Sequence, residues 1–539
     1  MFQVLGRIVY IYHFKNCFEF LKPILNYKKI NKMIPLFKVF MNNNMEPVLN
    51  TLNSGMITQS QKVEEFESKL KEWFDYKNIL TVNSATSGLT LALRLLNLKE
   101  GDEVLCTPLT CFATTCSVLA NKLKIKWVDV DVNTCNMDLD DLKYKISSST
   151  KAILVVHWGG SPIDLDKLKN IAGDIPIIED CAHAFGAEYN GKKIGCHENI
   201  AVFSLQAIKH LTTGDGGLIF LPNETLYKRA KLLRWFGIDR ERPTTSIDSR
   251  LENNIEEWGY KFHMNDINAS IGLCNLPFVQ DNLSKMRKNA YFYNLNLSNI
   301  EGITLLNNNE KSAFWIYTIK VKGKKDFIDF MLSKNIIVSQ VHKRNDINDC
   351  VKQYKTDLPN MDRLDKEIVA IPVGWWLTQE NLDYIVKCIR DWAEKKHFQI
   401  RTLQKEDKDE YLNLLFELNG YVCDGKKFDS IIDFFEGNSS QKIYVLFVNG
   451  KLVSTAKVIY EPKFYENIAH IEDVVTLNKY RNYGYASILI KTIVKEAMTH
   501  DFAGMTYKIV LNCNENNIDF YEKNGFIKKG VEMSMNFKN

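Results

Sequence analysis

Three segments in the first half of the sequence carry residue types that could bind a phosphorylated, nitrogen-containing ring. In NSATSG (83–88), hydroxyl side chains and free backbone N–H groups lie between an expected strand and an expected helix, where a phosphate can bind. Asp180 and His183 follow an apolar strand in IPIIEDCAHAFG. Lys209 follows another strand and precedes a glycine-rich turn in AVFSLQAIKHLTTGDGG.

The chemistry of these residues is complementary. A carboxylate such as Asp180, at the carboxyl end of a strand, can pair with a protonated ring nitrogen and so make the ring an electron sink. A lysine such as Lys209 becomes a nucleophile when it is partly desolvated. Taken singly, each group has an ordinary explanation as a helix cap, a structural histidine or a solvated lysine. Their order along the chain is the more specific signal.

The elements that must position these residues alternate between short apolar strands and amphipathic helices. We expect a helix in 89–98, and the expected strands are 79–83, 124–130, 152–158, 175–178 and 201–205. This pattern predicts an α/β domain with a mostly parallel sheet covered on both faces.

Together with SGMITQSQKVEEFE and GYKFHMNDINASIG, these segments closely resemble the DegT/DnrJ/EryC1/StrS family of sugar aminotransferases, roughly over residues 33–395. The resemblance implies a transferase of fold type I that depends on pyridoxal 5'-phosphate (PLP). Such enzymes aminate the keto group of a nucleotide-linked sugar, usually with glutamate as amino donor. The resemblance also implies a homodimer in which the GYKFHMND segment reaches the partner's active site.

The resemblance assigns roles to individual residues. Lys209 would bind PLP covalently and move the proton during transamination, and its presence disfavours the related dehydratases that lack this lysine. Asp180 would hold the pyridine nitrogen, and His183 would lie near the ring hydroxyl. The other implied PLP contacts are Ala85, Thr86, Cys111, Ser204 and Lys261.

Two of these positions depart from the family pattern. Cys111, in LTCFAT, stands where an aromatic residue often stacks on the cofactor ring. Lys261 stands where an asparagine often reaches the phosphate from the partner, although a lysine can still bind phosphate as a point charge. We therefore expect an altered PLP affinity or substrate preference.

A cluster of polar residues follows another apolar strand in VSQVHKRND. It could line the pocket for the sugar or the nucleotide, and a solvated loop is an equal alternative. The residues concerned are His342, Lys343, Arg344 and Asn345.

The pattern changes near residue 395, where a new strand, FQIRTL, opens a mixed α+β region. We expect an N-terminal extension over 1–32, an aminotransferase domain over 33–396 and a second domain over 397–539. In that second domain, Arg481, Gly484 and Ala486 form R-x-x-G-x-A at a helix start, where backbone N–H groups can bind a pyrophosphate. A glycine-containing turn is the simpler alternative.

The segments HIEDVV, YKIVLNC and NIDFYEKNGF resemble the GNAT acetyltransferase superfamily, and locally glucosamine-6-phosphate N-acetyltransferases. The implied reaction is direct acetyl transfer from acetyl-CoA to an amine. Tyr521 would protonate the departing thiolate, and Glu472 and Asp473 would orient the amine or take its proton. The implied acetyl-CoA contacts are Val474, Val475, Arg481, Tyr483, Gly484, Tyr485, Ala486, Asn517 and Tyr521.

One substitution leaves the acetyl acceptor open. Asn512 stands where the related sugar-phosphate enzymes usually have an aspartate, and an amide cannot act as a carboxylate base.

Composition narrows the remaining possibilities. A net charge of +4 over 539 residues gives no reason to expect nucleic-acid binding. The twelve cysteines show neither CxxC pairs nor zinc-ligand spacing, so we expect a reduced, cytoplasmic protein without a metal site. Residues 1–32 are aromatic and apolar, but Arg7, Lys15 and Glu19 interrupt them, so a membrane span is not expected.

These observations predict a bifunctional enzyme of amino-sugar biosynthesis. The first domain would transaminate a nucleotide-linked 4-keto-6-deoxyhexose, and the second would N-acetylate the new amine. Two alternatives stay open for the second domain: an uncoupled acetyltransferase acting on glucosamine 6-phosphate or another amine, and a non-catalytic module that binds acetyl-CoA.

Overall fold

The computed structural model contains two compact units, one ending at Cys388 and the other beginning at Ile389. Helix α14 (Gln379–Lys395) contains this boundary. The predicted extension over 1–32 lies outside the described residues. The structure describes residues 33–240, 254–395, 398–420, 425–436, 440–448, 450–464, 467–481, 484–499 and 508–528.

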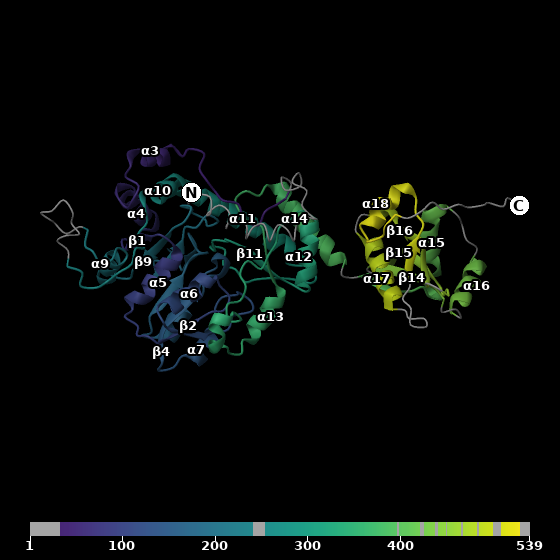
Figure 1. Ribbon diagram of the computed structural model, residues 1–539, viewed down its shortest axis with the longest axis horizontal. Helices are drawn as coiled ribbons and strands as arrows, with labels where there is room; N and C mark the ends of the chain where they lie inside the picture. The colour runs from purple at the N-terminus through teal and green to yellow at the C-terminus, as the bar shows by residue number, and fades with distance from the viewer. Residues whose placement is uncertain are drawn as a thin grey trace. The chain divides into compact units, whose positions relative to one another are not determined.

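A seven-stranded sheet forms the centre of the first unit, with strand order β1-β9-β8-β5-β4-β2-β3. Four of its strands, β1, β9, β4 and β2, are labelled in Figure 1. Strand β9 runs antiparallel to both of its neighbours, and the other pairs are parallel. The predicted mostly parallel sheet is therefore confirmed. Its strands are β1 (Ile79–Val82), β2 (Glu103–Cys106), β3 (Lys124–Trp127), β4 (Thr150–Val156), β5 (Ile177–Asp180), β8 (Ile200–Ser204) and β9 (Gly217–Phe220).

Helices follow most of these strands, and several begin at a side chain that caps the first turn. Asn223 and Asn265 each accept one backbone N–H of the helix that follows, and Asp138 accepts two, which satisfies free donors of the first turn. The helices are α3 (Glu46–Ser54), α4 (Gln61–Phe74), α5 (Ala85–Leu95), α6 (Phe112–Ala120), α7 (Leu139–Lys145), α8 (Leu165–Ala172), α9 (Glu224–Leu233), α10 (Asp266–Asn275) and α11 (Val279–Leu297). A short hairpin joins β6 (Glu188–Tyr189) to β7 (Lys192–Lys193).

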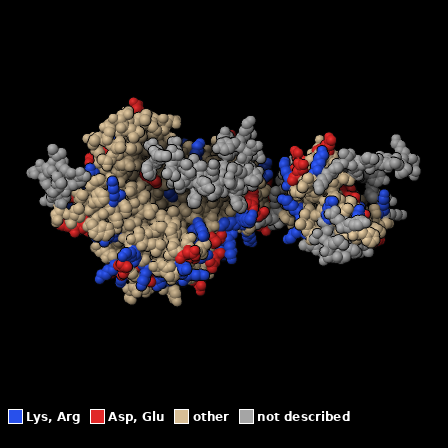
Figure 2. Space-filling view, viewed as in Figure 1, with Lys and Arg blue, Asp and Glu red and all other residues tan. Residues whose placement is uncertain are grey.

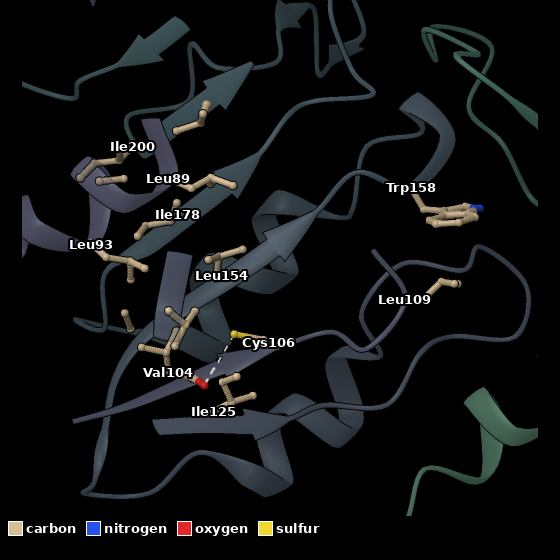
Figure 3. Packing of buried hydrophobic residues seen from close by; sticks show 14 of the residues in the cluster. Leu89, Leu93, Val104, Cys106, Leu109, Ile125, Leu154, Trp158, Ile178 and Ile200 are labelled. Atoms are coloured by element: carbon tan, nitrogen blue, oxygen red, sulfur yellow. Dashed lines mark hydrogen bonds between the residues drawn. The ribbon is translucent and has the colours of Figure 1, made fainter. Parts of the chain in front are cut away.

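The large sheet is apolar on both faces because successive side chains of a strand point to opposite sides. On one face, Leu154 and Ile178 pack in a cluster with Leu89 of α5 (Figure 3). On the other face, Ile153 packs in a cluster with Phe66 of α4 and with residues of α7, α8 and α11. Helices therefore cover both faces, and the polar groups that could do chemistry lie at the strand ends.

A smaller sheet completes the first unit, with strand order β10-β11-β12. Backbone hydrogen bonds attach the segments around it to the large sheet: Ala313 N–H donates to Gly160 O at 2.9 Å, and Asn345 N–H donates to Pro108 O at 2.8 Å. Residues far apart in sequence thus reach the carboxyl ends of the parallel strands. The elements are β10 (Ile303–Leu305), β11 (Tyr317–Val321), β12 (Ile368–Ile371), α12 (Lys324–Ser333) and α13 (Pro359–Glu367).

The second unit is an α+β fold around a five-stranded sheet, in the order β13-β14-β15-β16-β17. Strands β16 and β17 are parallel, and the other neighbours are antiparallel. Leu489 and Ile493 of α17 pack on one face, and Leu414 and Phe428 belong to the cluster on the other. The elements are β13 (Phe398–Thr402), β14 (Gln441–Val448), β15 (Lys451–Glu461), β16 (Ile468–Thr476), β17 (Lys508–Leu511), α15 (Lys408–Asn419), α16 (Gly425–Glu436), α17 (Tyr485–Thr499) and α18 (Ile518–Glu522).

Within the described ranges, every helix is too short or too polar to cross a bilayer.

Candidate functional site

The turn between β1 and α5 leaves backbone donors free for a phosphate. The Ser84 hydroxyl caps the helix by accepting the Ser87 N–H at 3.1 Å. The helix begins at Ala85, so the N–H groups of Ala85 and Thr86 have no partner inside it. Both residues are half-buried. A phosphate at this position would be bound by these donors and by the positive end of the helix.

A glycine brings this turn next to Ser204. Gly217 of β9 pairs with Val82 at the end of β1 and with Ser204 at the end of β8. A Cβ atom at Gly217 would lie 2.7 Å from Ala85 N, too close for any side chain. Because Gly217 has no side chain, the backbone of Ser84 and Ala85 can approach the strand position that pairs with Ser204.

Asp180 lies buried at the carboxyl end of β5. Its Oδ2 accepts the Thr114 hydroxyl at 2.7 Å, and its Oδ1 accepts the Ala182 N–H at 3.1 Å. Burial raises the pKa of Asp180, although both hydrogen bonds act against the shift. A cation bound beside this carboxylate, such as a protonated ring nitrogen, would favour its charged form. Thr114 of α6 was not predicted from the sequence.

The Lys209 amine is enclosed by protein, although part of the residue is accessible. Its Nζ lies 3.4 Å from the centroid of the Trp315 ring system. Burial lowers the pKa of Lys209 from 10.5 to about 7, and the nearby Asp180 opposes the shift. A neutral amine is therefore available near physiological pH, as nucleophilic chemistry requires. Trp315 is a second site residue that sequence reasoning missed.

His183 is buried against the same indole ring, with ring centroids 4.0 Å apart and an angle of 17° between the planes. Burial and the positive charge of Lys209 hold the pKa of His183 well below its usual range. His183 is therefore a neutral ring. The structure thus brings Asp180, His183 and Lys209 to the same end of the sheet.

A cavity of about 340 Å³ includes three of the four residues proposed for the sugar or nucleotide pocket. These are His342, Lys343 and Asn345. Arg344 does not line the cavity. The complete lining is Thr110, Phe112, Val341, His342, Lys343, Asn345, Asn348 and Cys350.

Arg344 instead holds its own loop together. Its guanidinium is buried and donates to Asp346 at 2.7 and 2.8 Å, and it also pairs with Asp362. Because the guanidinium is already paired with both carboxylates, the structure gives no support to Arg344 as a substrate contact.

Cys111 is exposed at the N-terminus of α6 and is not among the cavity-lining residues. The next residue, Phe112, lines the cavity and supplies an aromatic ring there. An aromatic residue at the first helical position after a strand end was the signal that could have identified Phe112.

The GYKFHMND segment packs on the phosphate-binding turn of its own chain. Asn83 N–H donates to Phe262 O at 2.7 Å, and Asn83 Nδ2 donates to Lys261 O at 3.3 Å. The Lys261 residue itself is exposed. The contribution of Lys261 to the active site of a partner subunit stays a prediction.

In the second unit, β16 and β17 separate after a short parallel pairing. The pairs run from Ile468 with Lys508 to Ile471 with Leu511, whereas β16 continues to Thr476. An extra residue bulges from β16 beside β15, and Asp473 there has a φ of 51°. Beyond Ile471, this edge of β16 has no strand partner within the described ranges, so an extended ligand could pair with its backbone.

The predicted acetyl-CoA contacts divide into backbone and side-chain groups. Val474 and Val475 pack into the two core clusters, so their backbones alone are available. Helix α17 begins at Tyr485, directly after Gly484 with its φ of 82°, so the N-terminus of this helix, with Ala486 in its first turn, lies beside the end of β16 in the sequence order strand–turn–helix. Arg481 Nε donates to Thr476 O at 3.0 Å. Tyr483 lies outside the described residues.

Tyr521 lies buried on α18, with its ring near those of Phe520 and Phe526. Burial raises the pKa of Tyr521, and the neighbouring Cys513 adds to the shift. The hydroxyl therefore keeps its proton at neutral pH and could donate it. Asn512 and Asn517 are exposed.

Glu472 and Asp473 are exposed at the bulge. Glu472 Oε2 lies 3.4 Å from Lys457 Nζ. Their participation in acetyl transfer stays a prediction.

Comparison with known proteins places both units. Residues 40–390 match the DegT/DnrJ/EryC1/StrS aminotransferase family, and the chain belongs to this family of PLP-dependent enzymes. Residues 401–526 match the GNAT acetyltransferase family, whose cosubstrate is acetyl-CoA. The predicted families, fold type, cofactor and cosubstrate are therefore confirmed.

Solved and curated relatives are similar to the first unit. AtS13 from Actinomadura melliaura is 45% identical, with a TM-score of 0.64, over 66% of this chain and 98% of its own. The sugar aminotransferase CalS13 from Micromonospora echinospora is 41% identical, with a TM-score of 0.64, over 66% of this chain and 99% of its own. GDP-perosamine synthase from Escherichia coli O157:H7 is 30% identical over 299 residues, 55% of this chain and 80% of its own.

Gly217→Ala tests the close approach at the phosphate-binding turn. The added methyl group would overlap Ala85 N, so we expect weaker PLP binding and a loss of about 1–3 kcal/mol in the free energy of unfolding. Titration with PLP and denaturant unfolding measure the two effects. Gly191→Ala, in the open β6–β7 hairpin, should cost stability through its φ of 78° without changing PLP affinity. Unchanged PLP affinity in Gly217→Ala would contradict the assignment.

The burial of the Lys209 amine predicts a low titration midpoint for this amine in PLP-free protein. Competitive labelling with an amine-reactive reagent should give a midpoint at about pH 7, because burial lowers the pKa of Lys209 to about 7. The exposed Lys228 serves as an internal reference in the same peptide map. A Lys209 midpoint near the ordinary value of 10.5 would show that its amine is solvated.

Proposed function

We propose that this chain is a bifunctional enzyme of amino-sugar biosynthesis. The first unit transaminates a nucleotide-linked 4-keto-6-deoxyhexose with glutamate as amino donor, and the second acetylates the new amine. The observation that carries this proposal is the enclosed Lys209 amine near Asp180, in one chain with an acetyltransferase unit. The names of two relatives add support: GDP-perosamine synthase, and UDP-4-amino-4,6-dideoxy-N-acetyl-beta-L-altrosamine transaminase from Campylobacter jejuni, which is 34% identical over 255 residues.

The residues at the sheet end suit PLP. The Ala85 and Thr86 N–H groups and the Ser204 hydroxyl would hold its phosphate, and Asp180 would hold its ring nitrogen. PLP, when bound, supplies an electron sink for the carbon that carries the amine. Lys209 Nζ, neutral near pH 7, takes a proton from one carbon and returns it to another. The amino group leaves glutamate, which becomes a 2-oxo acid, and replaces the keto oxygen of the sugar.

In the second unit, the edge of β16 and the start of α17 hold acetyl-CoA through backbone groups. The amine nitrogen attacks the thioester carbonyl carbon, and the carbon–sulfur bond breaks. Tyr521 donates its proton to the departing sulfur, while Glu472 or Asp473 accepts a proton from the nitrogen. Because both units are in one chain, the amine is released at a raised effective concentration near the second site.

The decisive experiment offers the PLP-loaded protein glutamate, acetyl-CoA and a panel of UDP-, dTDP- and GDP-linked 4-keto-6-deoxyhexoses, with products identified by mass spectrometry. We expect an N-acetylated amino sugar, and the free amine when acetyl-CoA is omitted. Lys209→Ala should abolish transamination but still acetylate a supplied amino sugar. The Tyr521→Phe variant should still produce the free amine, but its acetylation rate should fall by about 10²–10⁴-fold.

Other outcomes identify the alternatives for the second unit. Formation of the free amine without its acetylation, together with acetylation of glucosamine 6-phosphate, would indicate an uncoupled acetyltransferase. Asn512 leaves the identity of the acetyl acceptor open. Acetyl-CoA binding without turnover on any amine would indicate a binding module. Failure of every keto sugar with PLP-loaded protein would refute the substrate class.

We also propose a reduced, cytoplasmic setting. The cysteines within the described ranges are all free thiols, some buried and some exposed.

We further propose that the chain forms a homodimer through the surface around α3. Leu49 and Leu52 of α3 are 58% and 46% exposed, and Met56 and Ile57 just beyond it are also exposed. Figure 2 shows few charged residues over this part of the first unit. An apolar surface of this kind favours association with another protein, and the family supports a second copy of this chain.

Leu49→Asp with Leu52→Asp should convert the dimer to a monomer, because the carboxylates would be desolvated in the interface. Sedimentation velocity measures the change. Leu295→Asp on α11, where the side chain is 62% exposed, is the matched control and should remain dimeric. A monomeric wild type, or a dimer unaffected by the double substitution, would exclude this surface.

A further inference from the structure

An ion pair completes the open edge of the large sheet. Strand β1 is an edge strand, and β9 pairs with one side of it. On its other side, Thr81 N–H donates to Glu67 Oε1 at 2.9 Å, and Thr81 O accepts from Arg234 Nη1 at 2.7 Å. Side chains from α4 and from the end of α9 therefore satisfy backbone groups that a neighbouring strand would otherwise pair.

Glu67 and Arg234 also pair with each other in this buried position. Arg234 Nη1 donates to Glu67 Oε1 at 2.6 Å, and the Thr81 hydroxyl donates to the same oxygen at 2.8 Å. The Arg234 side chain is 2% exposed and that of Glu67 is 9% exposed. Burial acts to raise the pKa of Glu67, but the charge of Arg234 and the hydrogen bonds from Thr81 and Arg234 hold it below its ordinary value. Glu67 is therefore an anion at neutral pH, and Arg234 balances its charge.

Backbone hydrogen bonds connect this ion pair to the phosphate-binding turn. Arg234 O accepts the Phe262 N–H at 2.9 Å, and Phe262 O accepts the Asn83 N–H at 2.7 Å. Asn83 lies between Thr81 and Ala85 in the sequence. Arg234 thus contacts the start of the turn by two routes, through Thr81 with its side chain and through Phe262 with its backbone.

The segment before Phe262 is packed closely against the end of α9. Tyr260 N–H donates to Leu233 O at 2.7 Å, and a Cβ atom at Gly259 would lie 2.4 Å from that same oxygen. Such close packing leaves the segment little freedom to move independently of α9. A displacement of Arg234 would therefore be transmitted to Phe262 and from there to Asn83.

We propose that Glu67 and Arg234 are positioning residues for the phosphate-binding turn, because their pairing at the open edge of β1 holds the Ala85 and Thr86 N–H groups in place for a phosphate. Neither residue contacts the cofactor in this role. The inference rests on the proposed function in one respect, the assignment of Ala85 and Thr86 to the phosphate of PLP. A comparison of PLP with pyridoxal, which has no phosphate, separates the two.

The variant for this test removes both charges at once. Glu67→Leu or Arg234→Met alone would leave an unpaired buried charge, which destabilises a fold strongly, whereas the double substitution leaves none. The double variant lacks every hydrogen bond from these side chains to Thr81. Lys145→Met on α7 is the matched control, because it breaks a half-buried ion pair, with Asp141 at 2.8 Å, away from the turn.

The primary measurement is the dissociation constant of PLP and of pyridoxal, by absorbance titration of PLP-free protein. We expect the double variant to bind PLP about 10-fold more weakly and pyridoxal as wild type does, and Lys145→Met to change neither. Unchanged PLP affinity in the double variant, or an equal loss for both ligands, would overturn the inference. Equal affinity of the wild type for PLP and pyridoxal would instead refute the phosphate assignment.

Hydrogen exchange of the PLP-free protein separates a local effect from a general loss of stability. In the double variant, peptides over 79–86 and 258–264 should exchange about 10-fold faster, whereas peptides over α7 should exchange as in wild type. Wild-type exchange in both segments would contradict the proposed positioning. If the double variant does not fold, Arg234→Lys replaces it in both measurements, because the shorter side chain keeps the charge beside Glu67 but should not also reach Thr81 O. The same selective loss of PLP affinity, smaller in size, is then expected, and its absence would overturn the inference.

Discussion

Burial of the Lys209 amine beside an indole ring, within the electrostatic influence of the Asp180 carboxylate, is the constraint on which the chemistry of the first unit depends. Away from water, an ammonium group is expensive to maintain, so the pKa of Lys209 falls to about 7. Asp180 opposes the shift, and Trp315 lies 3.4 Å from the amine. The same burial that makes the amine reactive makes it destabilising when charged, and the apolar packing on both faces of the sheet must offset that cost.

Most of the first unit could be predicted from sequence because its signals are local. Apolar runs that end in polar groups marked β5 and β8, with Asp180 and Ser204 at their ends. Trp315 could not be predicted, because its contact with Lys209 joins positions more than a hundred residues apart. The ion pairs of Arg344 could not be predicted for a related reason. A polar cluster in the sequence does not reveal which side chains are already paired, and the Arg344 guanidinium is paired with Asp346 and Asp362.

In the second unit, the motif did not reveal the distortion of the strand that contains it. HIEDVV, which resembles the GNAT superfamily, lies in β16, yet pairing with β17 stops at Ile471, and a bulge at Asp473 accompanies the separation. A bulge depends on the register of two strands, which no single strand encodes. Val474 and Val475 pack with the two cores, so only their backbone could contact a ligand at this edge.

The two units differ in how long each must hold its cofactor or cosubstrate. PLP is regenerated in each cycle, so a site that encloses Asp180 and the Lys209 amine can keep it bound. Acetyl-CoA is consumed in each turnover and must leave as free CoA. An open strand edge and exposed residues such as Glu472 and Asn517 suit that exchange. Of the three side chains proposed to donate or accept a proton in acetyl transfer, Tyr521 is buried whereas Glu472 and Asp473 are exposed, and Tyr521 is the group whose proton must be retained until the thiolate departs. In each unit, burial thus shifts the pKa of one group proposed for proton transfer, downward for Lys209 and upward for Tyr521.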